Sequence, residues 1–74
     1  MEIKEPRKAL KKARIFNGYT QRDMSSLIGI TERQYQNLEY GDSFGSEATW
    51  DKLEGVLGVP WQTLAAKTRK PTQQ

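Results

Sequence analysis

The stretch that decides the fold is TQRDMSSLIGITERQYQNLEYG, residues 20–41. Thr20 and Thr31 are each followed three residues later by a side chain that can complete a capping box, Asp23 and Gln34 respectively. In such a box the threonine hydroxyl and the later side chain satisfy two backbone N–H groups at the start of a helix. The stretch therefore predicts two helices, one beginning after Thr20 and the other after Thr31.

The link between these two helices is Gly29-Ile30-Thr31. A three-residue link is too short for an antiparallel pair and favours a steep crossing, and glycine readily adopts the left-handed backbone that such a turn needs. We expect Ile30 to fill the space beneath the turn. Met24, Ser25 and Ile28 should face inward, with the small Ser25 where the two helices pass close.

The helix predicted over residues 32–40 has two different faces when its residues are placed about 100° apart. One face is predicted to be buried and carries Thr31, Tyr35 and Leu38. The other carries Glu32, Arg33, Gln36, Asn37 and Tyr40. Arginine pairs with guanine in a DNA groove, asparagine or glutamine with adenine, and glutamate accepts from cytosine. This face therefore suits hydrogen bonding to base edges more than general attraction to DNA.

The flanking sequence predicts three further helices and no strand. Residues 7–16 follow Pro6 without a helix breaker and end before an Asn-Gly pair, Ser46 can cap a helix over residues 47–57, and Pro60 opens a short last segment. The inward-facing residues of these segments are predicted to be Leu10, Ala13, Trp50, Leu53, Val56, Leu57 and Leu64. We expect an all-α, compact five-helix domain.

Composition excludes several classes of site. The chain has 74 residues, enough for one small domain, and contains neither cysteine nor histidine. Disulfide frameworks, the usual zinc sites, cysteine nucleophiles and histidine-based acid–base catalysis are therefore excluded. No apolar run is long enough to cross a bilayer and no signal-peptide pattern opens the chain. We expect a cytoplasmic protein that is not an enzyme and needs no cofactor, metal or small-molecule ligand.

The charge is unevenly distributed along the chain. The net charge is +3, with six basic side chains in residues 1–14 and three more in residues 67–70. Residues 15–66 hold three basic groups against seven acidic ones, a net charge of −4. Any DNA-binding surface must therefore combine the first helix with a few well-placed groups, because no uniformly basic face is available.

A family resemblance runs through residues 10–64. These residues resemble the helix-turn-helix domain of lambda repressor-like and Cro-like regulators, also called the xenobiotic response element type. The matching positions are Leu10, Arg14, Gly18-Tyr19-Thr20-Gln21, Met24-Ser25, Ile28-Gly29-Ile30, Leu38-Glu39-Tyr40-Gly41, Ser46, Thr49-Trp50 and Leu57-Gly58-Val59. The spacing needs no gap from Leu10 to Gly41.

The resemblance implies roles for several polar residues. Gln21 would touch a phosphate and support the recognition helix over residues 31–40, while Arg14 and Glu39 match a pair that forms an internal salt bridge in many members. The full set implied to contact DNA is Thr20, Gln21, Arg22, Thr31, Glu32, Arg33, Gln36, Asn37, Tyr40 and Ser43. The family usually has alanine at Ser25 and isoleucine or valine at Tyr35. The loop 42–45 lacks the basic residues of some relatives.

Several side chains keep two interpretations. For Arg14 we favour the internal ion pair over DNA contact, and for the lysines of the first helix we favour ordinary solubilising charge over phosphate contact. Trp50 is expected in the core. Trp61 fits either the core or a contact between two copies through the fifth helix, and Phe44 fits either a lid on the core or an exposed contact.

These observations lead to a hypothesis with one alternative. We expect residues 5–67 to form the helix-turn-helix DNA-binding domain, with a flexible arm at 1–4 and a flexible tail at 68–74. The domain would be a bacterial or phage-encoded transcriptional regulator in the cytoplasm, a repressor that binds double-stranded DNA as a homodimer. The alternative is a protein-interaction module on the same fold, such as an antitoxin, coactivator or anti-repressor.

Overall fold

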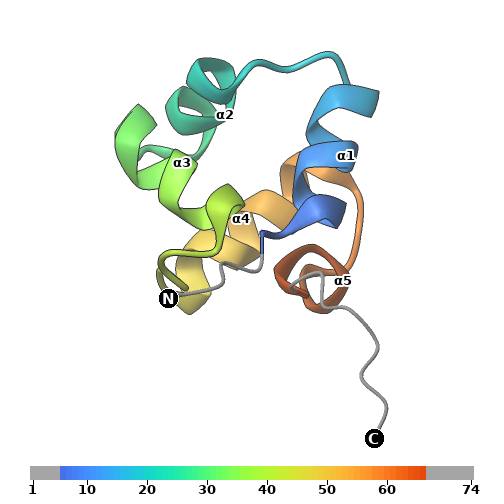
Figure 1. Ribbon diagram of the computed structural model, residues 1–74. Helices are drawn as coiled ribbons and strands as arrows, with labels where there is room; N and C mark the ends of the chain where they lie inside the picture. The colour runs from blue at the N-terminus through green and yellow to red at the C-terminus, as the bar shows by residue number, and fades with distance from the viewer. Residues whose placement is uncertain (1–5, 67–74) are drawn as a thin grey trace, which may run out of the picture.

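Five α-helices account for the architecture of the described part of the chain (Figure 1). The computed structural model describes residues 6–66, and within that range there is no strand. The helices are α1 (Lys8–Phe16), α2 (Gln21–Ile28), α3 (Glu32–Tyr40), α4 (Glu47–Leu57) and α5 (Trp61–Ala65). The predicted all-α, five-helix fold is confirmed. The arm at 1–4 and the tail at 68–74 lie outside the described residues.

Local capping sets the start of α2 and α3. The Asp23 N–H donates to the Thr20 hydroxyl and the Thr20 N–H donates to the Asp23 carboxylate, both at 3.0 Å. The same reciprocal pair joins Thr31 and Gln34 at 2.9 and 3.0 Å. Both predicted capping boxes are confirmed. Gly29 ends α2 in the left-handed region at φ 77°, a conformation that glycine adopts without a Cβ penalty.

Two local predictions are wrong. Helix α1 begins at Lys8, one residue later than expected, because Arg7 has a non-helical backbone whose N–H donates to the Glu39 carbonyl at 2.9 Å. Thr31 is exposed, although the helical spacing placed it in the buried stripe with Tyr35 and Leu38. As the N-cap residue, Thr31 has an extended backbone at ψ 158°, so the helical angle does not describe the direction of its side chain.

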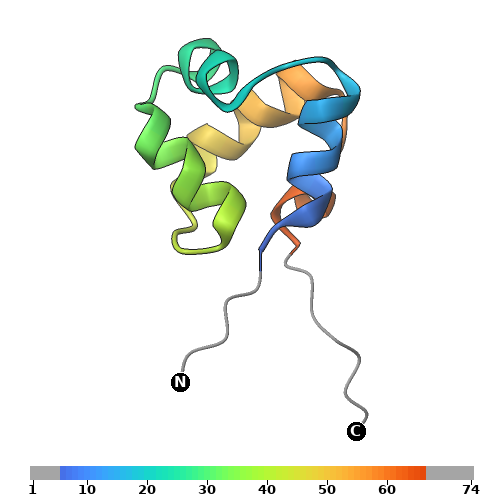
Figure 2. The same ribbon diagram turned by 45° about the horizontal axis from the view of Figure 1, so that its top comes forward.

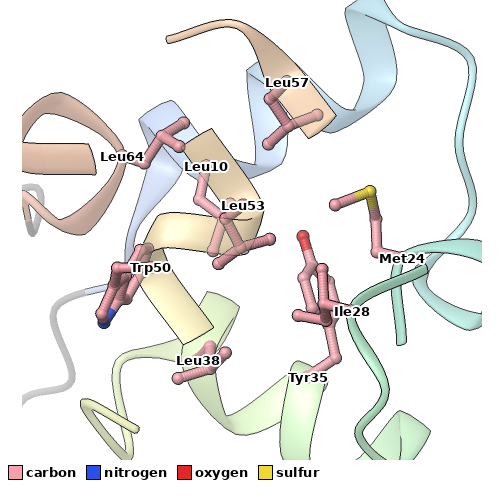
Figure 3. Close-up of a cluster of buried hydrophobic side chains, with 9 residues drawn as sticks. All are labelled: Leu10, Met24, Ile28, Tyr35, Leu38, Trp50, Leu53, Leu57 and Leu64. Atoms are coloured by element: carbon pink, nitrogen blue, oxygen red, sulfur yellow. The ribbon is translucent and has the colours of Figure 1, made fainter. Parts of the chain in front are cut away.

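The helices enclose one apolar core (Figure 3). Its buried side chains come from every helix: Leu10, Met24, Ile28, Tyr35, Leu38, Trp50, Leu53, Leu57 and Leu64. Helix α2 packs on α3 and α4, while α1 packs on α3 and α5. In Figure 2, α4 runs from the α3 side of the molecule to the α1 side. Because α4 spans the domain, it supports both the α2–α3 pair and the α1–α5 pair.

Three aromatic residues of the C-terminal half, Phe44, Trp50 and Trp61, form one cluster. Trp50 is 1% exposed, which confirms its place in the core. Trp61 is half-buried and packs against that core, and Phe44 lies 5.7 Å from Trp50 and 6.5 Å from Trp61 between ring centroids. Phe44 nevertheless stays 48% exposed. Phe44 therefore packs on the core residue Trp50 and also faces solvent, and its role as an exposed contact stays a prediction.

Arg7 is a structural residue that the sequence analysis missed. It is 3% exposed. Its guanidinium donates to the carbonyls of Leu38 and Ser43, both at 2.7 Å, and to the carbonyl of Ala65 at 2.9 Å. Its Cζ also lies 5.2 Å from the Trp50 ring centroid. One cation thus joins the end of α3, the following loop and the end of α5.

Within residues 6–66, none of the helices is both long and apolar enough to span a membrane.

The buried position of Arg7 predicts a large loss of stability for Arg7→Met. Three carbonyls lose a charged donor in a buried site, so we expect the free energy of unfolding to fall by about 3 kcal/mol. Lys8→Met is the control, since Lys8 is exposed and surface substitutions change stability by about 0.5 kcal/mol or less. Urea unfolding followed by circular dichroism measures both. Equal midpoints for the two variants would show that the Arg7 contacts contribute little.

Candidate nucleic-acid interface

The turn between α2 and α3 sets the crossing of the two helices. The Ile30 N–H donates to the Ser25 carbonyl at 3.0 Å across Gly29, and the Ile30 side chain packs against the core as predicted. Ser25 is 5% exposed, and its hydroxyl donates to the Arg22 carbonyl at 2.7 Å. Because this hydroxyl is satisfied within its own helix, serine fits where the family usually has alanine.

The carboxylate of Glu39 is the main polar group on the buried side of α3. Glu39 is 2% exposed. It accepts from Arg14 Nε at 2.6 Å and Nη2 at 3.3 Å, from Gln21 Nε2 at 3.1 Å and from the Tyr35 hydroxyl at 2.6 Å. The internal ion pair expected for Arg14 and Glu39 is confirmed. We call these four residues the Glu39 network.

The hydrogen bonds of the network keep Glu39 ionised. Burial raises the pKa of this carboxyl, but the hydrogen bonds from Arg14, Tyr35 and Gln21 outweigh burial and bring the pKa below its ordinary value of 4.5. Burial also raises the pKa of Tyr35, and its hydrogen bond to Glu39 acts in the same direction, so its hydroxyl remains a donor. The pKa of Arg14 is raised, chiefly by its hydrogen bond to Glu39.

Tyr35 therefore has a clear role at a position where the family usually has isoleucine or valine. Its ring is fully buried in the core, and Figure 3 shows its hydroxyl directed into the space between α2 and α4. The hydroxyl reaches Glu39 from one helical turn away. Sequence reasoning could have found this contact, because residues four apart on a helix lie side by side.

Gln21 carries the network outward to the exposed face of α3. Its amide nitrogen donates to Glu39, and its amide oxygen accepts from Gln36 Nε2 at 3.3 Å. The carboxylate can only accept, so it determines which way the Gln21 amide points. The support that Gln21 was expected to give the recognition helix is present. Its phosphate contact stays a prediction.

The predicted DNA-contacting residues lie on α2 and α3, at the N-caps of these two helices and in the loop that follows α3. Gln21, Gln36 and Asn37 are partly buried; the exposed ones are Thr20, Arg22, Thr31, Glu32, Arg33, Tyr40 and Ser43. The structure brings together two smaller groups among them. An open hollow of about 470 Å³ is lined in part by Thr20, Gln21, Arg22 and Glu32, and another of about 260 Å³ in part by Asn37 and Ser43.

An exposed ion pair between Arg22 and Glu32 also joins α2 to α3 at this surface. Arg22 Nε lies 3.8 Å from Glu32 Oε1, and both side chains are largely exposed. A solvated pair at this distance contributes little to stability. Both groups can therefore be redirected to a ligand at little cost.

The basic residues of the N-terminal segment divide into two classes. Lys8, Lys11 and Lys12 are exposed as expected, whereas Arg7 and Arg14 are buried and bonded to protein groups. The expected contribution of this segment to a DNA surface is therefore smaller than its charge suggests. Only the three lysines of α1 remain available for phosphate contact within the described part of the segment.

No group of three or more aspartate or glutamate side chains within residues 6–66 is placed to hold a metal ion.

Comparison with known proteins gives two findings. A family model described as a helix-turn-helix domain matches residues 8–68. The chain is also 40% identical over 59 residues to the SPbeta prophage-derived uncharacterized HTH-type transcriptional regulator YonR of Bacillus subtilis (strain 168). This match covers 80% of the chain and 55% of the relative. The chain thus spans about half the length of the curated relative it matches.

The ionised state of Glu39 predicts a specific pH dependence of stability. A carboxyl whose pKa is lower in the folded protein contributes stability above its unfolded pKa, and this contribution is lost as the pH falls through the folded pKa. Glu39→Gln should lower the free energy of unfolding by about 3–5 kcal/mol at pH 7, because it leaves Arg14 buried without its counter-charge. The difference between the native chain and the variant should shrink below the ordinary carboxyl pKa of 4.5.

Urea unfolding at pH 7, 5, 4 and 3 measures this difference, with Glu32→Gln as the exposed control. Should Glu39→Gln be too unstable to study, Tyr35→Phe tests the same network with a smaller loss of about 1.5–3 kcal/mol at pH 7. A gap between native and Glu39→Gln chains that stays constant down to pH 3 would contradict the assignment.

Proposed function

The chain belongs to the helix-turn-helix family, and from this membership we propose that it is a sequence-specific regulator of transcription that binds double-stranded DNA. One observation carries the proposal: the polar, solvent-facing side of α3 is hydrogen-bonded to the start of α2. Arg33 is exposed on α3, and Gln36 is joined through Gln21 to the buried Glu39 network. Because Gln36 is held in this way, it can meet a base edge at low cost in conformational entropy.

In the proposed complex α3 lies in the major groove. Arg33 would pair with a guanine, and Gln36 and Asn37 with adenines, while Glu32 would accept from a cytosine. Tyr40 would reach the backbone or a thymine methyl group from the last turn of the helix.

The start of α2 would lie over the phosphate backbone. The first N–H groups of a helix and its dipole favour an anion, and Thr20, Gln21 and Arg22 line the open hollow at this point. Thr31 and Ser43 would donate hydroxyl hydrogen bonds to neighbouring phosphates. With few basic groups on the described surface, we expect weak binding to random DNA and a modest dependence on salt.

The proposed biological role is repression by occupying a promoter, without catalysis. The prophage origin of the relative supports a bacterial or phage-encoded regulator that acts on DNA in the cytoplasm. The protein-interaction alternative is tested by selection from a pool of random duplexes. A regulator enriches one motif, whereas a module that contacts only proteins enriches none.

The proposal includes a homodimer on a two-fold symmetric operator. Such a dimer would place two α3 helices in successive major grooves about 34–36 Å apart. Helix α5 would lie at the contact, where Gln62 and Thr63 are exposed and Trp61 is half-buried.

Arg33→Ala is expected to weaken binding to the selected operator by about 1–3 kcal/mol and to relax the preference at one base pair. Lys11→Ala should instead weaken all sequences alike and lower the salt dependence, if Lys11 meets a phosphate. Fluorescence anisotropy with operator and random duplexes at two salt concentrations separates the two effects. If Arg33→Ala lost the same affinity for the operator and for the random duplex, α3 would not be the helix that recognises the base sequence.

A charge at the proposed dimer contact tests the pairing of two copies. Gln62→Glu would place like charges across the two-fold axis, so we expect affinity for a full operator to drop about tenfold or more while affinity for a half-site is unchanged. Because Gln62 is exposed, the fold should tolerate the substitution. If the affinity for the full operator did not change, the dimer contact would not lie at Gln62 on α5.

A further inference from the structure

A second surface of the domain has a chemistry unlike that of the candidate DNA interface. A hollow of about 290 Å³ lies between the loop before α4, helix α4 and helix α5. It is lined by three aromatic and two acidic residues: Phe44, Trp50, Trp61, Glu47 and Asp51. We call it the aromatic cage. It shares no residue with the set predicted to contact DNA.

The walls of the aromatic cage are held in place. Trp50 is 1% exposed, and its indole N–H donates to the Phe44 carbonyl at 2.6 Å. The Phe44 and Trp61 rings meet nearly edge to face, at 81° between their planes. The Trp61 backbone N–H donates to Glu54 Oε1 at 3.3 Å, which ties the start of α5 to α4. Little side-chain freedom remains to be lost when a ligand enters.

These rings already stabilise one cation within the protein. The Arg7 Cζ lies 5.7 Å from the Phe44 ring centroid and 5.2 Å from that of Trp50, within the range of cation–π attraction. The Arg7 guanidinium donates to three backbone carbonyls. These bonds hold Arg7 in the interior, and it is not among the residues that line the cage.

The mouth of the cage is acidic. Glu47 and Asp51 are exposed and lie four residues apart on α4, so they share one helix face. The two negative charges of these carboxylates exceed the single positive charge of the Arg7 guanidinium, which lies behind the rings. Phosphate groups are therefore repelled from this surface, while a cation is attracted both by the carboxylates and by the ring faces.

We propose that the aromatic cage binds an arginine side chain presented by a segment of another protein. A guanidinium is planar, stacks on aromatic rings and can donate in pairs to carboxylates, whereas a lysine ammonium is a strongly hydrated point charge. Glu47 and Asp51 supply the acceptors, and Phe44 and Trp61 supply the accessible rings. The proposal does not depend on DNA recognition, since the two surfaces share no residue.

The chain contains two tryptophans, and both line the cage. Intrinsic tryptophan fluorescence of the full chain therefore reports occupancy directly. The probe is the peptide acetyl-Gly-Arg-Gly-amide, compared with the same peptide carrying citrulline or lysine in place of arginine. The titration is made at a protein concentration low enough for a monomer, because Trp61 also belongs to the proposed dimer contact.

We expect a saturable response to the arginine peptide, with affinity about tenfold or more above that of the uncharged citrulline peptide and clearly above that of the lysine peptide. No saturable response, or equal binding of arginine and citrulline peptides, would overturn the proposal. Equal binding of the lysine peptide would overturn the assignment to a guanidinium.

The double variant Glu47→Gln/Asp51→Asn tests the acidic mouth. Both residues are exposed, so the variant should fold, and it should bind the arginine peptide about tenfold more weakly. Glu32→Gln, which removes an exposed carboxylate from α3, is the matched control and should bind the peptide as the native chain does. Unchanged binding by the double variant would overturn the role of the carboxylates.

Discussion

The ionised carboxylate of Glu39 lies where three helices meet, and the orientation of α3 depends on it. Burying a charge without partners would cost several kcal/mol. Here Arg14 from α1, Gln21 from α2 and Tyr35 from α3 itself donate to the two oxygens. Every buried side-chain nitrogen and oxygen in the described part of the chain has a hydrogen-bond partner. Because these bonds have specific lengths and directions, they fix how α3 lies against α1 and α2 more closely than apolar packing alone could.

The same arrangement links the interior of the domain to its exposed polar face. Gln21 bonds Glu39 with one end of its amide and Gln36 with the other. A second cation, Arg7, bonds the end of α3 and the loop after it to the end of α5. A chain of this size has a small core, and two buried arginines supply connections between elements that a larger core would otherwise provide. The described surface retains few basic groups, which agrees with the proposed recognition of particular bases more than with general attachment to DNA.

Much of this architecture follows from local sequence. The capping boxes at Thr20 and Thr31 and the glycine between the helices depend only on neighbouring residues, so the bounds of α2 and α3 could be predicted. The polar face of α3 follows from helical spacing for the same reason. The family resemblance adds the pairing of Arg14 with Glu39, which no local pattern contains.

What could not be predicted depends on distant parts of the chain. The burial of Arg7 requires carbonyls from residues 38, 43 and 65 to converge on one point, and no spacing within the N-terminal segment indicates that convergence. Helical spacing also fails at Thr31, because this capping residue has an extended backbone and its side chain does not follow the helical angle. The aromatic cage likewise arises where a loop, α4 and α5 meet.

The most direct test of the Glu39 network is an NMR pH titration of the Glu39 carboxyl carbon in the native chain. We predict a midpoint below the ordinary value of 4.5; a midpoint at or above that value would mean that burial outweighs the three donors, and the network would not hold α3 as described.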